Sequence, residues 1–448
     1  MTQIVVALSA LIISVVLFAS GNAFVNSLLG VRMSLSGIEP MTIGIVLFFF
    51  ALGFVIGSRI CPGIIQRVGH IRAFAVFSAA AAIAALVYPM SQSMWLWGGM
   101  RFASGVAAAG LIITVESWFS CVATAGNRAR LFSMYQIFFY SAVAGGQLLL
   151  QVAPPESAIP FSLAAILLVG SLIPLAMSHM HSPNIEAVEA LPMLEVYREA
   201  PLGVIASLLN GVIMSGFYAM APVYATSTGL DVGQISVFMS VAIFSAMIIA
   251  GPIGYFCDRH DRARVMLVVT LISSLAGAVI FLLGNLSFLW ICAFTAVFFG
   301  LSASIYSIAV AITNDRMTQN QIVAASATLL TAYGIGNLVG PLLNASVMDA
   351  VGANGFFLAN SLLLVVLLIL ILRDMQRVPA ISPEEQEDFV SVSPDVFPVM
   401  AEIDPRNEDY DEDDKTLDDL FFDPKESEED ESDASAEESP EVSGQDAR

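Results

Sequence analysis

Long apolar runs separated by short polar spacers occupy the chain from its first residues to Arg373. Each run is about 20 residues long, the length that a helix needs to cross the hydrocarbon core of a membrane. The runs lack the alternation of apolar and polar residues found in membrane barrel strands, so the predicted fold class is an all-α membrane protein. The twelve predicted spans cover residues 4–27, 41–60, 73–92, 95–119, 131–152, 158–178, 202–226, 234–256, 265–284, 286–312, 322–347 and 353–373.

The composition agrees with this prediction and separates the chain into two parts. Hydrophobic residues make up 57% of the sequence, which excludes an ordinary soluble globular protein. Up to Arg373 there are 13 arginines and 12 acidic residues, whereas 27 acidic residues and five basic ones follow it. We therefore predict a disordered acidic cytoplasmic tail at residues 374–448. Docking of its residues 416–424 on a protein partner or on the basic loops is the alternative.

The arginines indicate how the predicted spans are oriented, because Lys and Arg are retained on the cytoplasmic side of a membrane. With the loops numbered alternately from a cytoplasmic N-terminus, twelve arginines fall inside, Arg32 falls outside and Arg101 lies within a span. Both termini are therefore predicted to be cytoplasmic. The first span has no basic residue ahead of it and is longer than the apolar region of a signal peptide, so we expect it to remain as a membrane helix.

The two halves of the sequence are similar to each other. Residues 36–44 and 228–236 align with an offset of 192, and the loops after the second and eighth spans align at nearly the same offset. Tyr140 and Tyr333 are 193 residues apart, and each precedes a glycine-rich stretch. This duplication predicts two parallel, pseudo-symmetric six-helix halves. The predicted N-terminal half, linker and C-terminal half cover residues 1–178, 179–201 and 202–373.

Short motifs in these halves resemble those of a known family. The loop after the eighth span follows the pattern G-x-L-a-D-R-x-G-R, with Asp261 where the second glycine is usual. In the first-half copy Arg67 and Gly69 remain, whereas Gln66 replaces the acid. The run RFASGVAAAG, which begins at Arg101, resembles an arginine-glycine motif of the fourth helix. Together the motifs resemble the major facilitator superfamily, and the wider run around them resembles its YcaD-like branch of bacterial transporters.

The resemblance implies the major facilitator fold, a place in the bacterial inner membrane and a gate at the cytoplasmic helix ends. The loop motifs are expected to bridge these ends when the protein closes toward the cytoplasm. The expected gate residues are Arg67, Gly69, Gly254, Asp258, Arg259, Arg128 and Arg130. Anchoring on the cytoplasmic side is the alternative role, and it is the one we expect for Arg262 and Arg264.

Two opposite charges, Arg101 and Glu116, lie in the predicted fourth span. They are 15 residues apart, about 22 Å along a helix, so they cannot pair with each other. Their directions around the helix differ by about 60°, so we predict that both face one central cavity. Arg101 stays charged and is the candidate that orients a solute. Glu116 is the candidate for proton coupling, because burial favours the protonated form of a carboxyl group.

Each of these charges also has a structural alternative. Backbone carbonyl groups of the first span near Asn22 can accept hydrogen bonds from Arg101. Glu116 can pair with Arg128 and Arg130 in the loop that follows its span.

Uncharged polar residues in other spans are weaker candidates for the solute cavity, because each can instead form a hydrogen bond between helices. These candidates are Asn22, Gln136, Tyr140, Gln147, Asn210, Tyr218 and Tyr306. His179 and His181 can bind a metal, but a solvated linker is the simpler interpretation. We expect no catalytic residues, metal site, cofactor or nucleic-acid partner, and hence no enzyme.

These features predict a secondary transporter in the lipid bilayer that moves a small organic solute by alternating access, as a monomer coupled to protons. An uncoupled facilitator or lipid-moving protein of the same fold is one alternative. A non-transporting membrane sensor that acts through its acidic tail is another. The cationic side chain in the outer half of the cavity favours an anionic or amphiphilic solute.

Overall fold

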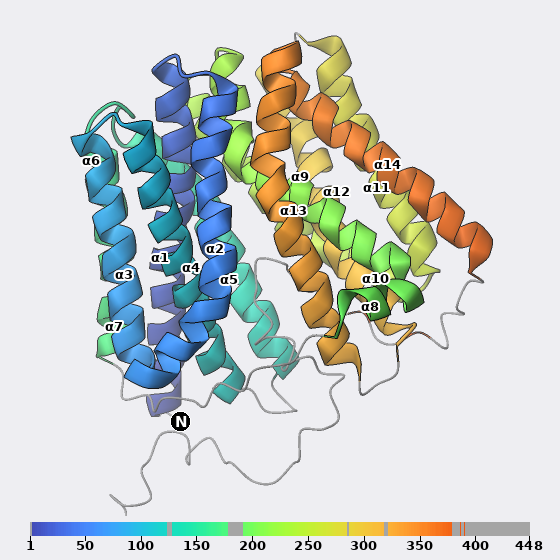
Figure 1. Cartoon of the computed structure of the whole chain (residues 1–448), viewed down its shortest axis with the longest axis horizontal. Coiled ribbons are helices and arrows are strands. Elements are labelled where there is room, and N and C mark those ends of the chain that lie inside the picture. Colours follow the sequence, from blue (N-terminus) through green and yellow to red (C-terminus); the bar gives the residue numbers. More distant parts are fainter. Residues whose placement is uncertain are drawn as a thin grey trace, which may run out of the picture.

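Long helices make up nearly all of the described chain in the computed structural model (Figure 1). The structure describes residues 2–122, 128–177, 191–284, 286–317, 321–378, 386 and 389. Most of the predicted tail, the first part of the predicted linker, and the side chains of Arg128 and Arg130 lie outside the described part.

The first half of the bundle contains six of the predicted spans. Its helices are α1 (Thr2–Leu35), α2 (Pro40–Val68), α3 (His70–Val87), α4 (Met94–Val122), α5 (Arg128–Leu148), α6 (Ile159–Gly170) and α7 (Leu172–Ala176). One span was predicted where α6 and α7 now follow each other. Pro174 has no N–H to donate to the carbonyl group of Gly170, which accounts for the break at this point.

The second half repeats this arrangement after the short helix α8 (Met193–Glu199). Its helices are α9 (Pro201–Ser227), α10 (Val232–Cys257), α11 (Arg262–Leu283), α12 (Phe288–Asn314), α13 (Ile322–Val351) and α14 (Gly355–Arg377). Ten described helices are long and apolar enough to cross a membrane, and α5 and α13 occupy the other two predicted spans. The chain is therefore a twelve-helix membrane protein, as predicted.

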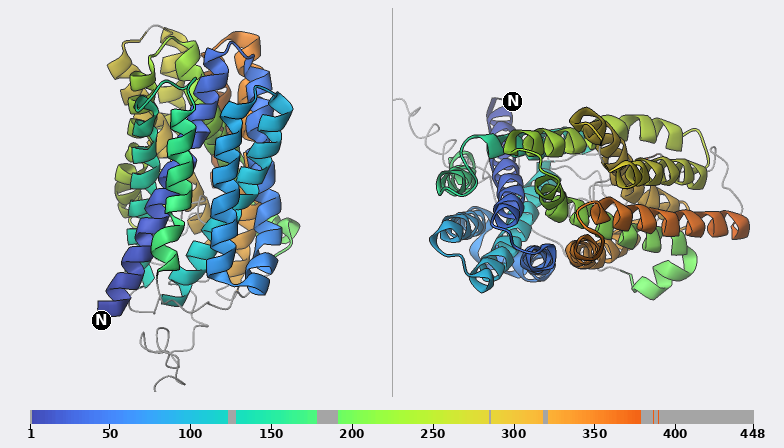
Figure 2. Two further views of the ribbon diagram at one scale, coloured as in Figure 1. Left: turned by 90° about the vertical axis from the view of Figure 1, so that its left-hand side faces the viewer. Right: turned by 90° about the horizontal axis from the view of Figure 1, so that it is seen from above.

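Helix pairing repeats between the halves. In the first half α2 packs on α4, α1 on α5 and α3 on α6, and in the second half α10 packs on α12, α9 on α13 and α11 on α14. The two halves lie side by side when the bundle is seen from above (Figure 2). The duplication predicted from the offset of 192 is therefore confirmed as a duplication of structure.

The aligned turns show the same repetition in the backbone. Gly37 and Gly229 both adopt positive φ angles, of 73° and 83°, in the turns after α1 and α9. Gly69 also has a positive φ, of 84°, between α2 and α3, but its counterpart Asp261 has a φ of −53° and accepts a hydrogen bond from the backbone of Ala263. The missing glycine of the second motif is thus replaced by a residue that caps α11.

Glycines allow the paired helices to touch through their backbones. A Cβ atom at Gly105 of α4 would overlap the carbonyl oxygen of Phe50 in α2, and one at Gly53 of α2 would overlap that of Phe102 in α4. Gly336 of α13 approaches the carbonyl group of Leu208 in α9 in the same way. Small residues of this kind hold membrane helices together, because lipid provides little hydrophobic drive for their association.

The two ends of the bundle differ in charge. At the end where α2 meets α3 and α10 meets α11, which we call the arginine end, Arg67, Arg72, Arg259 and Arg264 are exposed. At the opposite end α1 meets α2 and α9 meets α10. The N-terminus lies at the arginine end (Figure 1).

A substitution in α4 tests the backbone contact between α2 and α4. Gly105→Ala should lower the melting temperature of the purified protein in detergent, because overpacking costs about 1–3 kcal/mol. The matched control is Gly99→Ala on the same helix, where a Cβ has open space. If both variants melt like the parent protein, α2 and α4 are not held at the separation seen here.

Candidate functional site

A cavity lies between the two halves, and six helices line it. The lining comes from α1, α2, α4 and α5 of the first half and from α9 and α13 of the second. It encloses about 1150 Å³ of space, including its opening to solvent. In transporters built from repeats, substrate sites lie at the interface between the repeats, which is the position of this cavity.

Four of the predicted cavity residues line this cavity. They are Arg101 of α4, Asn22 of α1, Gln147 of α5 and Tyr218 of α9. Gln147 is held by its neighbours, since its side-chain oxygen accepts a hydrogen bond of 2.6 Å from Ser27 Oγ. The structure thus brings residues from three first-half helices and one second-half helix to one cavity, and their role there stays a prediction.

The other four polar candidates are not among the lining residues of this cavity. Asn210 is fully buried and donates a hydrogen bond of 2.7 Å to the carbonyl oxygen of Ser302, so it joins α9 to α12. Tyr306 is buried against the ring of Tyr333, with ring centroids 5.4 Å apart. Gln136 and Tyr140 lie on α5 but do not line this cavity.

Several lining residues were not predicted. Asn26 and Ser27 continue the polar face of Asn22 along α1, and Tyr333 and Asn337 contribute from α13. Asn26 stands four residues after Asn22, a spacing that places both on one helix face and could have identified it. Tyr333 and Asn337 are also four residues apart, next to the glycines that pack α13 on α9.

Arg101 is the one charged residue among the described residues that line the cavity. Its side chain is 3% exposed, and its guanidinium carbon lies 4.3 Å from the centroid of the Phe50 ring. Gly105, one helical turn further along α4, lets the backbone of α2 approach and so places this ring beneath the guanidinium. Within the described residues, Arg101 Nε and Nη1 have no hydrogen-bond partner. Backbone carbonyl groups near Asn22 therefore do not satisfy these two nitrogens.

Glu116 occupies a different environment from Arg101. Its side chain is fully buried and is not among the residues that line the cavity. The Tyr135 hydroxyl of α5 donates a hydrogen bond of 3.4 Å to Glu116 Oε1. The prediction that Arg101 and Glu116 face the same cavity is therefore wrong for this structure. Glu116 packs between α4 and α5 toward the arginine end, and the side chains of Arg128 and Arg130, its alternative partners, are not described.

Hydrogen bonds join the halves on the side of the cavity toward the opposite end. Ser236 of α10 donates to the carbonyl oxygen of Gln147 at 2.7 Å, and Ser240 donates to that of Ala144 at 2.8 Å. The backbone N–H of Met41 donates to Asp349 Oδ2 at 3.2 Å, joining α2 to α13. These bonds hold the first and second halves together at the opposite end of the bundle.

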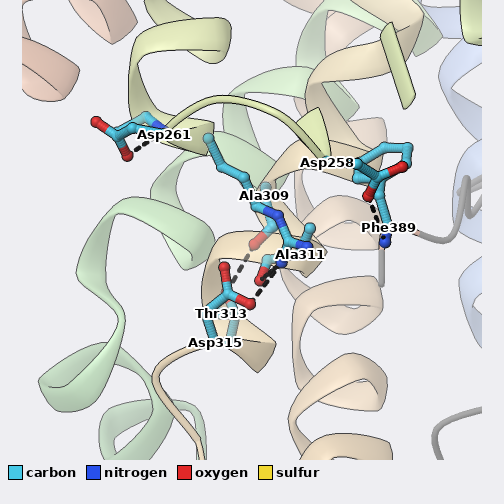
Figure 3. Close-up of polar contacts among 9 residues, drawn as sticks. Asp258, Asp261, Ala309, Ala311, Thr313, Asp315 and Phe389 are labelled. Atoms are coloured by element: carbon cyan, nitrogen blue, oxygen red, sulfur yellow. Dashed lines mark hydrogen bonds and ion pairs between the residues drawn. The ribbon is translucent and has the colours of Figure 1, made fainter. Parts of the chain in front are cut away.

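The predicted gate residues lie at the arginine end. Arg67 and Arg259 are exposed, and the Arg259 guanidinium stacks on the ring of Tyr255 at 4.1 Å. Asp258 accepts a hydrogen bond of 2.9 Å from the backbone N–H of Phe389, whose ring lies against Gly254. Figure 3 shows this contact. Gly69 forms the turn between α2 and α3.

Phe389, which contacts Asp258, falls within the predicted tail. The structure therefore places Phe389 against the helix bundle rather than free of it. The predicted boundary at residue 374 also needs correction, because α14 continues to Arg377. Asp374 pairs with Arg316 at 2.7 Å, and this ion pair accounts for the added turn of helix.

Arg262 was expected to anchor the cytoplasmic side, and the structure shows that its side chain also forms a buried ion pair. Its side chain is 2% exposed and pairs with Asp315 Oδ1 at 2.5 Å, joining the start of α11 to the end of α12. It also donates to the carbonyl oxygen of Ala311 at 3.2 Å. Figure 3 shows Asp315 beside Ala311 at the arginine end.

The first-half counterpart of Arg262, at the offset of 192, is His70. It is also buried, and its Nε2 lies 2.9 Å from Ser117 Oγ of α4. Corresponding helices are thus connected in both halves. A hydrogen bond connects α3 to α4 in the first half, and an ion pair connects α11 to the end of α12 in the second. The adjacent Asp315 and Arg316, directly after a long apolar run, were the signal for the second arrangement.

Comparison with known proteins agrees with this architecture. The family model described as "Major Facilitator Superfamily" matches residues 11–306 and 203–407. The MFS-type transporter YE1530 of Yersinia enterocolitica serotype O:8 / biotype 1B is 28% identical over 379 residues, covering 82% of this chain and 96% of the relative. The MFS-type transporter YcaD of Escherichia fergusonii is 25% identical over 360 residues, covering 79% and 92%.

Two solved structures share the fold. A crystal structure of the nucleoside transporter NupG has a TM-score of 0.71 at 15% sequence identity, and covers 82% of this chain and 99% of that one. A bacterial homologue of the human lysosomal transporter Spinster, in an inward-facing and occupied conformation, has a TM-score of 0.69 at 11% identity. It covers 86% of this chain and 99% of that one.

The ion pair between α11 and α12 makes a testable contribution to stability. Arg262→Ala should reduce the free energy of unfolding by about 3–5 kcal/mol, because it leaves the buried Asp315 carboxylate without its partner. Thermal unfolding in detergent measures the effect. Arg264→Ala is the matched control, since the Arg264 side chain is 71% exposed and its pairing with Asp261 should contribute little. Equal melting temperatures for the two variants would contradict the structural role of Arg262.

Proposed function

Since the chain belongs to the major facilitator superfamily, we propose that it is a proton-coupled secondary transporter of a small organic solute. It acts by alternating access in the bacterial inner membrane. The observation that carries the proposal is the cavity between the halves, which contains a buried, charged Arg101. A charge inside the membrane is costly, so it is kept where a solute or an ion uses it.

The orientation of the bundle is inferred from its exposed arginines. We place the arginine end in the cytoplasm, because Lys and Arg are retained there. The bonds from Ser236, Ser240 and Met41 then join the halves on the periplasmic side of the cavity, which supports an inward-facing state. Both termini are cytoplasmic in this orientation.

Within this proposal the predicted residues have separate roles. Arg101 orients the solute, with Asn22, Gln147 and Tyr218 around it in the cavity. Glu116 exchanges the proton between α4 and α5. The gate consists of Arg67, Asp258 and Arg259 with the glycines Gly69 and Gly254, joined by Arg128 and Arg130.

An uncoupled facilitator is the second candidate, and the position of Glu116 favours it. Its carboxyl group packs against Tyr135 and does not line the cavity, so a solute bound there does not touch it. In the coupled mechanism, protonation of Glu116 changes the packing of α4 on α5 and thereby the balance between the two states of the transporter.

Neutralising Glu116 separates the two candidates. In reconstituted vesicles with an imposed pH gradient, Glu116→Gln should abolish accumulation of solutes from a radiolabelled panel of organic acids and their neutral analogues. Exchange of the same solutes at equal concentrations should persist, because the cavity is unchanged. Glu156→Gln, at the opposite end of the bundle, is the control and should accumulate solute like the parent. If Glu116→Gln accumulates solute as well as the parent protein does, Glu116 is not the coupling residue.

Neutralising Asp258 tests the gate. Asp258→Asn should weaken the closed cytoplasmic state, since one partner of a charge-assisted hydrogen bond is lost. A cysteine introduced at the exposed Ser133 of α5 should then react several-fold faster with a membrane-impermeant maleimide. Asp261→Asn in the same loop is the control and should leave the rate unchanged. A folded Asp258→Asn protein that labels at the parent rate would show that Asp258 does not bias the gate.

A further inference from the structure

We infer that the solute of the central cavity is an organic anion with an apolar body, and that Arg101 binds its anionic group. This inference rests on the proposed transport function and names its substrate class. Three features of the cavity support it: a cation with unused donors, the lack of a fixed counter-charge among the described lining residues, and aromatic walls.

The first feature is the state of the Arg101 side chain. It is 3% exposed, yet Nε and Nη1 lack hydrogen-bond partners within the described residues. The Tyr88 hydroxyl lies beside the guanidinium, and the Phe50 ring covers one of its faces. A guanidinium has five N–H donors in one plane, and the donors on these two buried nitrogens are unsatisfied. Carboxylate, sulfonate and phosphate groups are the acceptors that match such donors best.

The second feature is the absence of a neutralising acid at the site. Among the described residues that line the cavity, none is an aspartate or a glutamate. Glu116 is fifteen residues away along the same helix, about 22 Å, and packs on α5 instead. The positive charge in the cavity therefore has no fixed partner among these residues, and an anionic solute supplies one. A cationic solute would meet uncompensated repulsion.

The third feature is the composition of the remaining wall. Phe18, Phe54, Phe139 and Tyr218 place aromatic rings in it, which favours an apolar solute body over a small inorganic anion. Asn26 of the first half and Asn337 of the second also line the cavity, and within the described chain the side-chain oxygen of each lacks a hydrogen-bond partner. These two amide oxygens are thus buried and unsatisfied beside the cavity.

The second half has no arginine at the position that corresponds to Arg101. The repeat aligns Gly300 of α12 with Gly105, and this places Ala296 at the position of Arg101. In α12 the carbonyl oxygen of Ala296 instead accepts a hydrogen bond of 2.8 Å from Ser245. The anionic group of the solute is therefore bound by the first half, whereas its apolar body meets aromatic rings from both halves.

Three probes that share one apolar body test the charge requirement. 4-Phenylbutyrate, 4-phenylbutanol and 4-phenylbutylamine are titrated against the full chain in a nonionic detergent, with binding measured calorimetrically at fixed ionic strength. The carboxylate should bind at least tenfold more tightly than the alcohol, and the amine should bind most weakly. Inorganic phosphate alone should bind more weakly than 4-phenylbutyrate. Equal affinity for the acid and the alcohol, or no binding of the acid at millimolar concentration, overturns the inference.

Variants of Arg101 test which group carries the preference. In Arg101→Met the tenfold preference for the carboxylate should disappear, and in Arg101→Lys it should weaken but remain. The ligand-free melting temperature of Arg101→Met should equal or exceed that of the parent, because an unpaired buried charge has been removed. A purely structural arginine would instead lower it, as Arg262→Met should. A preference that survives Arg101→Met, or an Arg101→Met protein that fails to fold, overturns the assignment of Arg101.

The same probes separate this inference from the proposed function. Uptake of radiolabelled 4-phenylbutyrate and of the neutral panel is measured in reconstituted vesicles. Carboxylate-selective binding without uptake of any solute would retain the anion site and reject transport. Uptake of neutral solutes together with equal binding of acid and alcohol would retain transport and reject the anion site.

Discussion

The direct contact of helix backbones within each half is the constraint on which the rest of this molecule depends. Gly53 and Gly105 remove the side chains that would separate α2 from α4, and Gly211 and Gly336 do the same for α9 and α13. In lipid, apolar side chains gain little from leaving their surroundings, so close packing has to hold the helices together. These contacts hold the paired helices of each half together, and the cavity lies at the junction between the halves.

The two halves use a common framework for different purposes. The first half carries the charge of the cavity on Arg101, whereas the second half carries buried ion pairs, Arg262 with Asp315 and Arg316 with Asp374, at the arginine end. At the position of Arg262 the first half has His70, hydrogen-bonded to Ser117. Among the described residues the duplicated fold is thus chemically asymmetric, with the charge of the cavity in the first half and these two ion pairs in the second.

The sequence alone was sufficient to predict the helices and much less of the site. Spans are set by apolar length, a property of each segment by itself, and all twelve coincide with helices. Whether a polar side chain faces the cavity depends on helix rotation and on the neighbouring helix, which a single sequence does not state. Asn22 and Asn210 illustrate the difference: both are asparagines in apolar helices, but only Asn22 lines the cavity, while Asn210 bonds to Ser302.

The error over Glu116 has the same cause and bears on mechanism. The angle of about 60° between the directions of Arg101 and Glu116 around the helix axis is correct for α4 by itself. It did not account for α5, which packs against the arginine end of α4 and receives Glu116 next to Tyr135. If Glu116 carries the proton, its charge is too distant from Arg101 to act on a bound anion by direct contact. Coupling then has to pass through the helix itself: a change in the packing of α4 on α5 moves the same rigid segment that holds Arg101 against Phe50.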